Sequence, residues 1–178
     1  LFRSCLGYLF LRHSSVSALL ARALPVTMWL AFGGFVIWIV MGLAGGIYAA
    51  LRRGRWQDRT LMGIALVGYS LPSFFIGLVL IFFVILEAHW LPFPKWVSPF
   101  ENPGRFLQTM ILPWVILAIL NAAFYVRLTR NQVLETFGED YVRTARAKGL
   151  PERVVVLKHA LRAGLTPIVT AAGLDLAY

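Results

Sequence analysis

Residues 23–51 read ALPVTMWLAFGGFVIWIVMGLAGGIYAAL and contain no Asp, Glu, Lys or Arg. About 20 predominantly apolar residues are enough for an α-helix to cross the hydrocarbon core of a bilayer. Residues 60–86 and 106–126 are also free of charged side chains and long enough to cross. Because backbone groups in lipid must satisfy one another, these stretches predict membrane-spanning helices. The expected fold class is therefore all-α, a polytopic transmembrane helical bundle.

The overall composition points to the same solvent. Of the 178 residues, 59% are apolar and only 14% are charged, whereas soluble domains carry about 25% charged residues. This balance excludes an ordinary soluble globule and intrinsic disorder. The net charge of +9 does not require nucleic acid, because cytoplasmic loops of membrane proteins also collect Lys and Arg. The lipid bilayer is the expected partner, with no nucleic acid.

The single cysteine, Cys5, cannot form an internal disulfide, and no Cys/His spacing is typical of a metal site.

A fourth apolar stretch begins at about residue 164 and runs to Tyr178, with Asp175 inside it. At about 1.5 Å per residue, this stretch is too short to cross a hydrocarbon core of about 30 Å. We therefore expect a partial span and a fragment of a longer protein, preceded by a further segment because Leu1 opens no signal-peptide pattern. The complete spans are placed at about residues 24–51, 60–86 and 106–128, within a transmembrane domain at residues 23–178 that follows an external segment at residues 1–22.

Loop charges set the expected orientation. Four arginines at residues 52–59 make the first loop cytoplasmic, whereas opposite charges cancel at residues 87–105 and make that loop external. The loop at residues 129–162 is again rich in Lys and Arg, so charge and alternation both place it in the cytoplasm. Alternation places residues 1–22 outside although they carry three arginines. Serines in this segment are suited to begin a short helix, and an interfacial helix along the outer surface is one expected arrangement.

Prolines and small residues inside the spans have expected packing roles. Membrane helices tolerate proline because neighbouring groups satisfy the freed carbonyls, so Pro72 and Pro113 are expected to kink their helices rather than end them. Gly42 and Gly46 form a G-x-x-x-G pair, which lets two helix backbones approach closely. We interpret this spacing as helix packing rather than as a ligand site. The same spacing recurs at Ser73 and Gly77.

Residues 139–162 predict a helix, a sharp turn and a second helix. The acidic residues Glu139 and Asp140 are typical of a helix start, and Gly149 stands where a left-handed residue ends a helix. Pro151 is suited to the first position of the second helix. Tyr141, Ala145 and Gly149 fall on one stripe of the first helix, so a narrow ridge of small residues beside an aromatic edge is expected. Such a ridge fits the cleft of a partner; a connector that lies on lipid headgroups is the open alternative.

These residues also resemble a known family. The sequence EDYVRTARAKGLPER at 139–153, continued by KHALR at 158–162, resembles the EAA loop of ABC importer permeases, and more narrowly that of the dipeptide, oligopeptide and nickel permeases. Against the general EAA pattern, only Ala145, Gly149 and Leu161 match strictly, and the departures are those of the peptide-permease variant. Further matches follow in order, with RALPVT at 22–27, LRRGRWQD at 51–58 and LPSF at 71–74.

The resemblance covers essentially residues 6–178 and implies a membrane-spanning permease subunit of an ATP-driven importer, with peptides as the expected substrates. It implies six spans, of which this chain holds the second to the fourth and the start of the fifth. The implied partners are ABC ATP-binding subunits, a second permease subunit and an extracytoplasmic substrate-binding protein, in the inner or plasma membrane of a prokaryote. ATP and Mg are expected on the ATP-binding subunits, with no cofactor and no catalytic site on this chain. The residues expected to form the ATPase-coupling loop are Tyr141, Arg143, Thr144, Ala145, Arg146, Ala147, Lys148, Gly149 and Leu150.

Two other classes remain open at this stage. A proton- or ion-coupled secondary transporter or channel needs ionisable groups within the membrane, and Asp175 is the one candidate inside a predicted span. Asp175 is suited to line a substrate path, to contact a peptide amine, or to pair with a neighbouring polar group. A non-transporting scaffold would explain the packing glycines but not the ordered family matches. No G-x-S-x-G, H-E-x-x-H or Walker motif is present, so an intramembrane enzyme is not expected.

Overall fold

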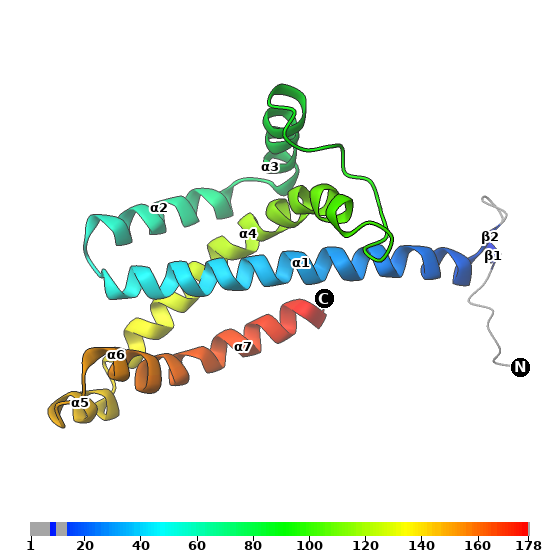
Figure 1. Ribbon diagram of the computed structural model, residues 1–178. Helices are drawn as coiled ribbons and strands as arrows, with labels where there is room; N and C mark the ends of the chain where they lie inside the picture. The colour runs from blue at the N-terminus through cyan, green and yellow to red at the C-terminus, as the bar shows by residue number, and fades with distance from the viewer. Residues whose placement is uncertain (1–7, 10–13, 178) are drawn as a thin grey trace, which may run out of the picture.

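The computed structural model of the chain describes residues 8–9 and 14–177, and Cys5 and much of the expected external segment at residues 1–22 lie outside these residues. The fold is all-α apart from one short antiparallel pair of strands, β1 and β2. Figure 1 shows α1 and α4 as the two longest helices. The described elements are β1 (Tyr8–Leu9), β2 (Ser14–Ser15), α1 (Val16–Leu51), α2 (Trp56–Ser70), α3 (Ser73–Leu80), α4 (Pro103–Phe137), α5 (Asp140–Ala147), α6 (Glu152–Val154) and α7 (Leu161–Ala177), with π-helical segments η1 (Ile81–Glu87) and η2 (Val155–Ala160).

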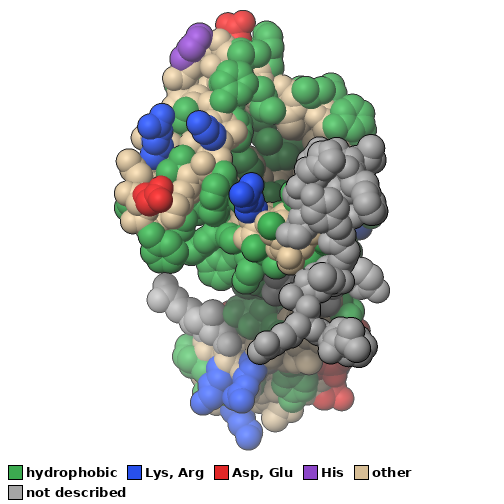
Figure 2. All heavy atoms as spheres, turned by 90° about the vertical axis from the view of Figure 1, so that its right-hand side faces the viewer, with side chains coloured by type: hydrophobic (Ala, Val, Ile, Leu, Met, Phe, Trp, Pro, Cys, Tyr) green, Lys and Arg blue, Asp and Glu red, His purple; other side chains and the backbone are tan. Residues whose placement is uncertain are grey.

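Two helices of the described part, α1 and α4, are long and apolar enough to cross a membrane. A third crossing is added if α2 and the α3–η1 run are counted as one bent span. Large hydrophobic side chains are exposed on most of these helices. On the face that Figure 2 displays, hydrophobic side chains predominate, and basic side chains lie at the lower end, where Figure 1 places α5 and α6. Such a surface suits lipid rather than water, because soluble monomers rarely expose large apolar patches.

Close packing of α1 against α4 depends on the glycine pair at residues 42 and 46. A β-carbon built at Gly42 would lie 2.4 Å from the β-carbon of Tyr125, and one built at Gly46 would lie 2.4 Å from that of Thr129. Real β-carbons do not approach this closely, so only glycine permits the observed distance between the two helices. The expected packing role of the G-x-x-x-G pair is confirmed.

The same two helices are joined nearer the other end of α1 by a tryptophan. The indole Nε1–H of Trp114 donates to the backbone oxygen of Trp29 at 3.0 Å. Its ring lies directly over Gly33, where an added β-carbon would lie 2.0 Å from the indole. Trp114 is partly buried, and the carbonyl of Trp29 provides a partner for its N–H group.

The second predicted span, residues 60–86, is not one helix. α2 ends at Ser70, α3 begins at Ser73, and the two runs are bent by 103°. The expectation that Pro72 kinks its helix without ending it is therefore wrong. The reason is steric: a residue before proline is driven out of the helical region, and Leu71 has the extended angles φ −83° and ψ 137°. The bend sends α3 away from the direction of α2, as Figure 1 shows.

Prolines inside three other helices behave differently. α4 continues through Pro113, as expected, α1 continues through Pro25, and α7 continues through Pro167. α1 begins at Val16, so residues 16–22 extend the first span along its own axis and do not form a separate helix on the outer surface. This part of the external-segment expectation is corrected. At Pro113, the helices packed around α4 support it across the lost N–H group.

Candidate functional site

Gly149 adopts the left-handed conformation that the sequence predicted, with φ of +74°. Its N–H group donates to the carbonyl oxygen of Arg146 at 2.9 Å. The N–H group of Leu150 reaches back to the carbonyl oxygen of Ala145 at 3.4 Å. Together these bonds form a Schellman motif, which satisfies carbonyl groups at the end of α5. Pro151 then lies at the N-cap of α6, one position before the first helical residue that the sequence predicted for it.

A small apolar core holds the two helices together across the turn. Val142 and Ala145 on α5 are buried against Val155 and Ala160 of η2, and Phe137 at the end of α4 covers the cluster. Ala145 is only 5% exposed. The expected ridge of Tyr141, Ala145 and Gly149 is therefore not presented to a partner as one stripe, because the middle residue faces the inside of the loop.

Arg146 connects the two sides of the turn. Its Nη2 lies 2.6 Å from Glu152 Oε1 and its Nε donates to Glu152 Oε2 at 3.2 Å. The guanidinium carbon also lies 5.4 Å from the centre of the Phe137 ring. Hydrogen bonding from Arg146 lowers the pKa of the Glu152 carboxyl, more than the slight burial of this group raises it. Arg146, one of the residues expected in the coupling loop, therefore also has an observed structural contact across the turn.

The remaining expected residues lie on the outside of the loop. Tyr141 and Leu150 are 44% and 38% exposed, and Thr144 is anchored by donation from its hydroxyl to the carbonyl oxygen of Asp140 at 2.8 Å. Arg143 makes a long, solvent-exposed contact of 3.7 Å with Asp140, and contacts of this kind contribute little. The structure thus leaves one continuous set of expected residues exposed around the turn: Tyr141, Arg143, Thr144, Arg146, Ala147, Lys148, Gly149 and Leu150.

The loop is fixed to the membrane helices at its base. α7 crosses α4 closely at Gly164, where an added β-carbon would lie 3.2 Å from the hydroxyl of Thr136 and 3.5 Å from the carbonyl oxygen of Gln132. That hydroxyl donates to the same carbonyl at 2.8 Å. Because α4 leads into α5, and α6 leads through η2 into α7, the exposed turn stands at the end of two packed helices rather than on a free loop.

A third ionic contact, which the sequence did not predict, ties the loop at residues 52–59 to α4. Arg130 donates through Nε and Nη2 to the two carboxylate oxygens of Asp58 at 2.6 and 2.8 Å. Asp58 is 3% exposed and also accepts the N–H of Gly54 at 3.0 Å, where φ is +77°. A lone acid among four arginines, four residues after a glycine, is the only sequence signal for this arrangement, and it does not identify Arg130 as the partner.

Asp175 takes the last of its three expected arrangements, pairing with a polar neighbour. The hydroxyl of Tyr125 donates to Asp175 Oδ2 at 2.5 Å. Beside this pair lies a cavity of about 310 Å³, to which α2 contributes Tyr69 and α4 contributes Asn121. The cavity is completed by Leu120 and Phe124, and we call it the polar cleft. Of its three polar members, the sequence analysis had selected only Asp175.

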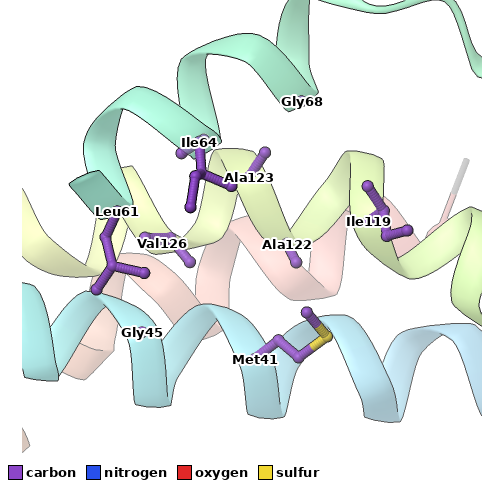
Figure 3. A pocket seen from close by; sticks show the side chains of 10 residues that line it. Met41, Gly45, Leu61, Ile64, Gly68, Ile119, Ala122, Ala123 and Val126 are labelled. Carbon is purple, nitrogen blue, oxygen red and sulfur yellow. The ribbon is translucent and has the colours of Figure 1, made fainter. Parts of the chain in front are cut away.

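A larger groove between α1, α2 and α4 has no such chemistry. Figure 3 shows its lining side chains, which are apolar and include the thioether of Met41, with glycines at Gly45 and Gly68. A lining without polar side chains offers no hydrogen bond to a solute. Within the described residues, no group of three or more His, Cys, Asp or Glu side chains is arranged to hold a metal ion.

These features define a class of protein: a polytopic helical membrane protein whose spans carry an exposed, rigid helix-turn-helix. The chain belongs to the family of binding-protein-dependent transport system inner membrane components, which it matches over residues 42–178. The resemblance to ABC importer permeases of the peptide family is thereby confirmed, and the secondary-transporter alternative is not favoured.

Named relatives agree with this assignment. Over 173 residues the chain is 38% identical to a putative peptide transport system permease protein of Brucella abortus (strain 2308). This alignment covers 97% of this chain and 55% of that protein. Over 161 residues it is 39% identical to the oligopeptide transport system permease protein OppB of Escherichia coli (strain K12). This alignment covers 89% of this chain and 50% of that protein. The chain thus spans about half the length of the curated relatives it matches.

Proposed function

We propose that this chain is part of the membrane-spanning permease subunit of an ATP-driven ABC importer for dipeptides or oligopeptides. Family membership and the names of the relatives support this proposal. The observation that carries it is the exposed turn around Gly149, held by two helices that continue into the membrane. The protein works as a multi-pass component of a prokaryotic cell membrane, with the turn in the cytoplasm and residues 88–102 outside.

In this proposal the exposed residues around the turn dock on separate ATP-binding subunits. These subunits bind ATP with Mg and hydrolyse it, and the permease chain itself catalyses no reaction. A second permease subunit completes the translocation path, and an extracytoplasmic binding protein delivers the peptide. Coupling between two distant sites requires an element that takes different positions in two global states. A loop with its own apolar core and an ionic link across the turn moves as one body.

The proposal is tested by purifying the full-length protein from native membranes and identifying the bound partners by mass spectrometry. The structure separates two effects of substitution at Gly149. The left-handed conformation strains a residue with a β-carbon by about 1 kcal/mol, yet an added β-carbon meets no atom of this chain within 4 Å. Gly149→Asn keeps the turn, because Asn tolerates this conformation, and we expect it to retain the ATP-binding subunit. Gly149→Trp should lose it.

A second pair of variants removes backbone strain from the comparison. Ala147 is exposed and helical, so Ala147→Trp adds bulk beside the turn without any unusual φ. Glu135 is exposed on α4 outside the expected contact set, so Glu135→Trp is the matched control. We expect loss of the ATP-binding subunit and of ATP-dependent peptide uptake only for Ala147→Trp. Normal uptake by both Gly149→Trp and Ala147→Trp would contradict docking at this turn.

A further inference from the structure

The polar cleft brings together three polar side chains from three different helices. Tyr69 lies near the end of α2, Asn121 lies in α4, and Asp175 lies near the end of α7. Charged residues are rare within membrane spans and are expensive there unless they serve a function or are paired. The contact with Tyr125 satisfies one oxygen of the Asp175 carboxylate, and the described residues provide no ion pair for its charge.

Asp175 is held from the side of the protein core. Tyr125 is fully buried, and its ring stacks on that of Trp38 with 6.4 Å between the ring centres. Because the tyrosine is fixed by packing, its hydroxyl fixes the carboxylate that it contacts. Asp175 itself is exposed towards the cleft side of the helices. The carboxylate is thus positioned and accessible at the same time.

The neighbouring amide adds a second acceptor. The Nδ2 group of Asn121 donates to the carbonyl oxygen of Leu117 at 3.0 Å. This bond commits the amide nitrogen to the helix backbone and leaves the Oδ1 atom for a ligand. A carboxylate and an amide oxygen in the lining of one cavity form a site for a group that carries several N–H donors and a positive charge.

The depth of the cleft is suited to a solute in transit. From the expected cytoplasmic ends of the spans, a rise of about 1.5 Å per residue places Tyr69, Asn121 and Asp175 about 10–16 Å into the hydrocarbon core. The middle of a core of about 30 Å lies at the same depth. Secondary transporters bind their substrates near this level, where a solute is shielded from both sides of the membrane.

We propose that the polar cleft receives the α-ammonium group of the peptide as it passes through the permease, with Asp175 as the charged acceptor. This inference rests on the proposed function and adds to it the part of the substrate that the membrane helices recognise. Tyr125 acts as a positioning residue, because its hydroxyl reaches the peptide only through Asp175.

The test uses the complete importer, with the full-length permease, in proteoliposomes. The probe is a tripeptide with a free amino group and a diazirine-bearing leucine at its first position. Illumination during turnover, followed by mass spectrometry, maps where the first residue lies. We expect labelling of the segments around Tyr69, Asn121 and Phe124, and about tenfold less labelling in Asp175→Asn, since a charge-assisted bond is replaced by a neutral one.

Glu135→Gln is the matched control, because it also converts an exposed carboxylate to an amide but lies outside the cleft. We expect it to label like the wild type. Tyr125→Phe should reduce the labelling of the cleft by a smaller factor, and Asp175→Glu should recover part of it. If Asp175→Asn fails to assemble with its partners, the wild type is tested with the free and the N-acetylated tripeptide, each at a concentration that saturates the binding protein, and we expect about tenfold less label in the cleft for the acetylated one.

The possible failures are distinct. Label that lies only outside the cleft overturns the ammonium site while leaving peptide import intact. The ammonium site is also overturned if the label in the cleft is equal for Asp175→Asn and the wild type and equal for the free and acetylated tripeptides. Absence of ATP-dependent tripeptide accumulation by the wild-type importer contradicts the proposed function itself.

Discussion

Gly46 is a position where one carbon atom decides whether two long helices can pack. An added β-carbon would lie 2.4 Å from the β-carbon of Thr129 and 2.7 Å from the carbonyl oxygen of Val126, and the backbone oxygen cannot move aside. We expect Gly46→Ala to destabilise the protein by about 2–3 kcal/mol, within the range found for overpacked cores. Unfolding in mixed detergent micelles measures this difference.

Gly63 provides the matched control for this substitution. It is an exposed glycine within α2, and an added β-carbon meets no atom within 4 Å. Gly63→Ala is therefore expected to leave stability unchanged or to raise it by about 0.5–1 kcal/mol through helix propensity. Equal destabilisation by both substitutions would mean that contact with α4 is not the cause.

The Asp58–Arg130 pair gives a second expectation for single residues. Asp58→Asn removes the charge that compensates Arg130, whose side chain is only 21% exposed. We expect a loss of about 3 kcal/mol, at the low end for buried pairs because Arg130 retains some contact with water. In a double-mutant cycle, adding Arg130→Gln should restore part of the loss. Strictly additive effects of the two substitutions would show that the contact contributes nothing.

Individual residues show clearly what the sequence can and cannot reveal. The left-handed turn at Gly149 and the close approach at Gly42 were predictable, because both depend on a property of glycine within its local pattern. The pairing of Asp58 with Arg130 was not, because the two residues are far apart in the chain and only the packing of α2 on α4 brings them together. A polar partner for Asp175 was among the expected arrangements, but Tyr125 was not identified as that partner, because the two residues are also far apart in the chain.

The stability of the helix-turn-helix at residues 140–160 is expected to depend on pH. The lowered pKa of Glu152 means that its pairing with Arg146 stabilises the turn above the ordinary glutamate pKa of about 4.3, and that this stabilisation is lost as pH falls through the lower, folded value. We expect amide hydrogen exchange at Gly149 and Leu150, corrected for intrinsic rates, to be steady near neutral pH and to accelerate in acid.

The size of this acid effect should be modest, because both side chains of the pair are exposed and salt screens them. Glu152→Gln should abolish the acid-dependent step while keeping a neutral hydrogen bond. A step of the same size in Glu152→Gln would assign the acid response to another group.

At the scale of elements, hydropathy found the apolar stretches but not their shape. Residues 60–86 carry no charged side chain, and Ser70 and Ser73 beside Pro72 do not by themselves distinguish one kinked span from the bent pair α2 and α3. Pro72 was recognised, yet its effect depends on whether neighbouring helices support the chain across it. Pro113 lies in α4, which contacts α1, α2, α3 and α7, and the helix continues there. In the same way, Ala145 was assigned to an outer stripe because the sequence does not show which face η2 covers.

The orientation of the whole molecule in the membrane is open to a direct measurement. Lys95 and Arg55 are exposed basic residues in two different loops, which the charge pattern places outside and inside the cell. In a Cys5→Ser background, a membrane-impermeant maleimide should label Lys95→Cys in intact cells and Arg55→Cys only after permeabilisation. Labelling in the reverse order would invert the topology and move the turn around Gly149 to the outer face.

The continuity of the helices at the turn has a mechanical consequence. Helical residues run from Glu152 to Ala177 without a break through α6, η2 and α7, a rod about 39 Å long at about 1.5 Å per residue. Its near end carries the turn and its far end carries Asp175, while α4 runs beside it from Asn121 down to Phe137. This rod and α4 are joined through α5 and the turn, and they cross closely where Gly164 contacts Thr136. A small change in the angle between the two helices at the turn would widen or narrow the gap between Asn121 and Asp175 without unfolding either helix.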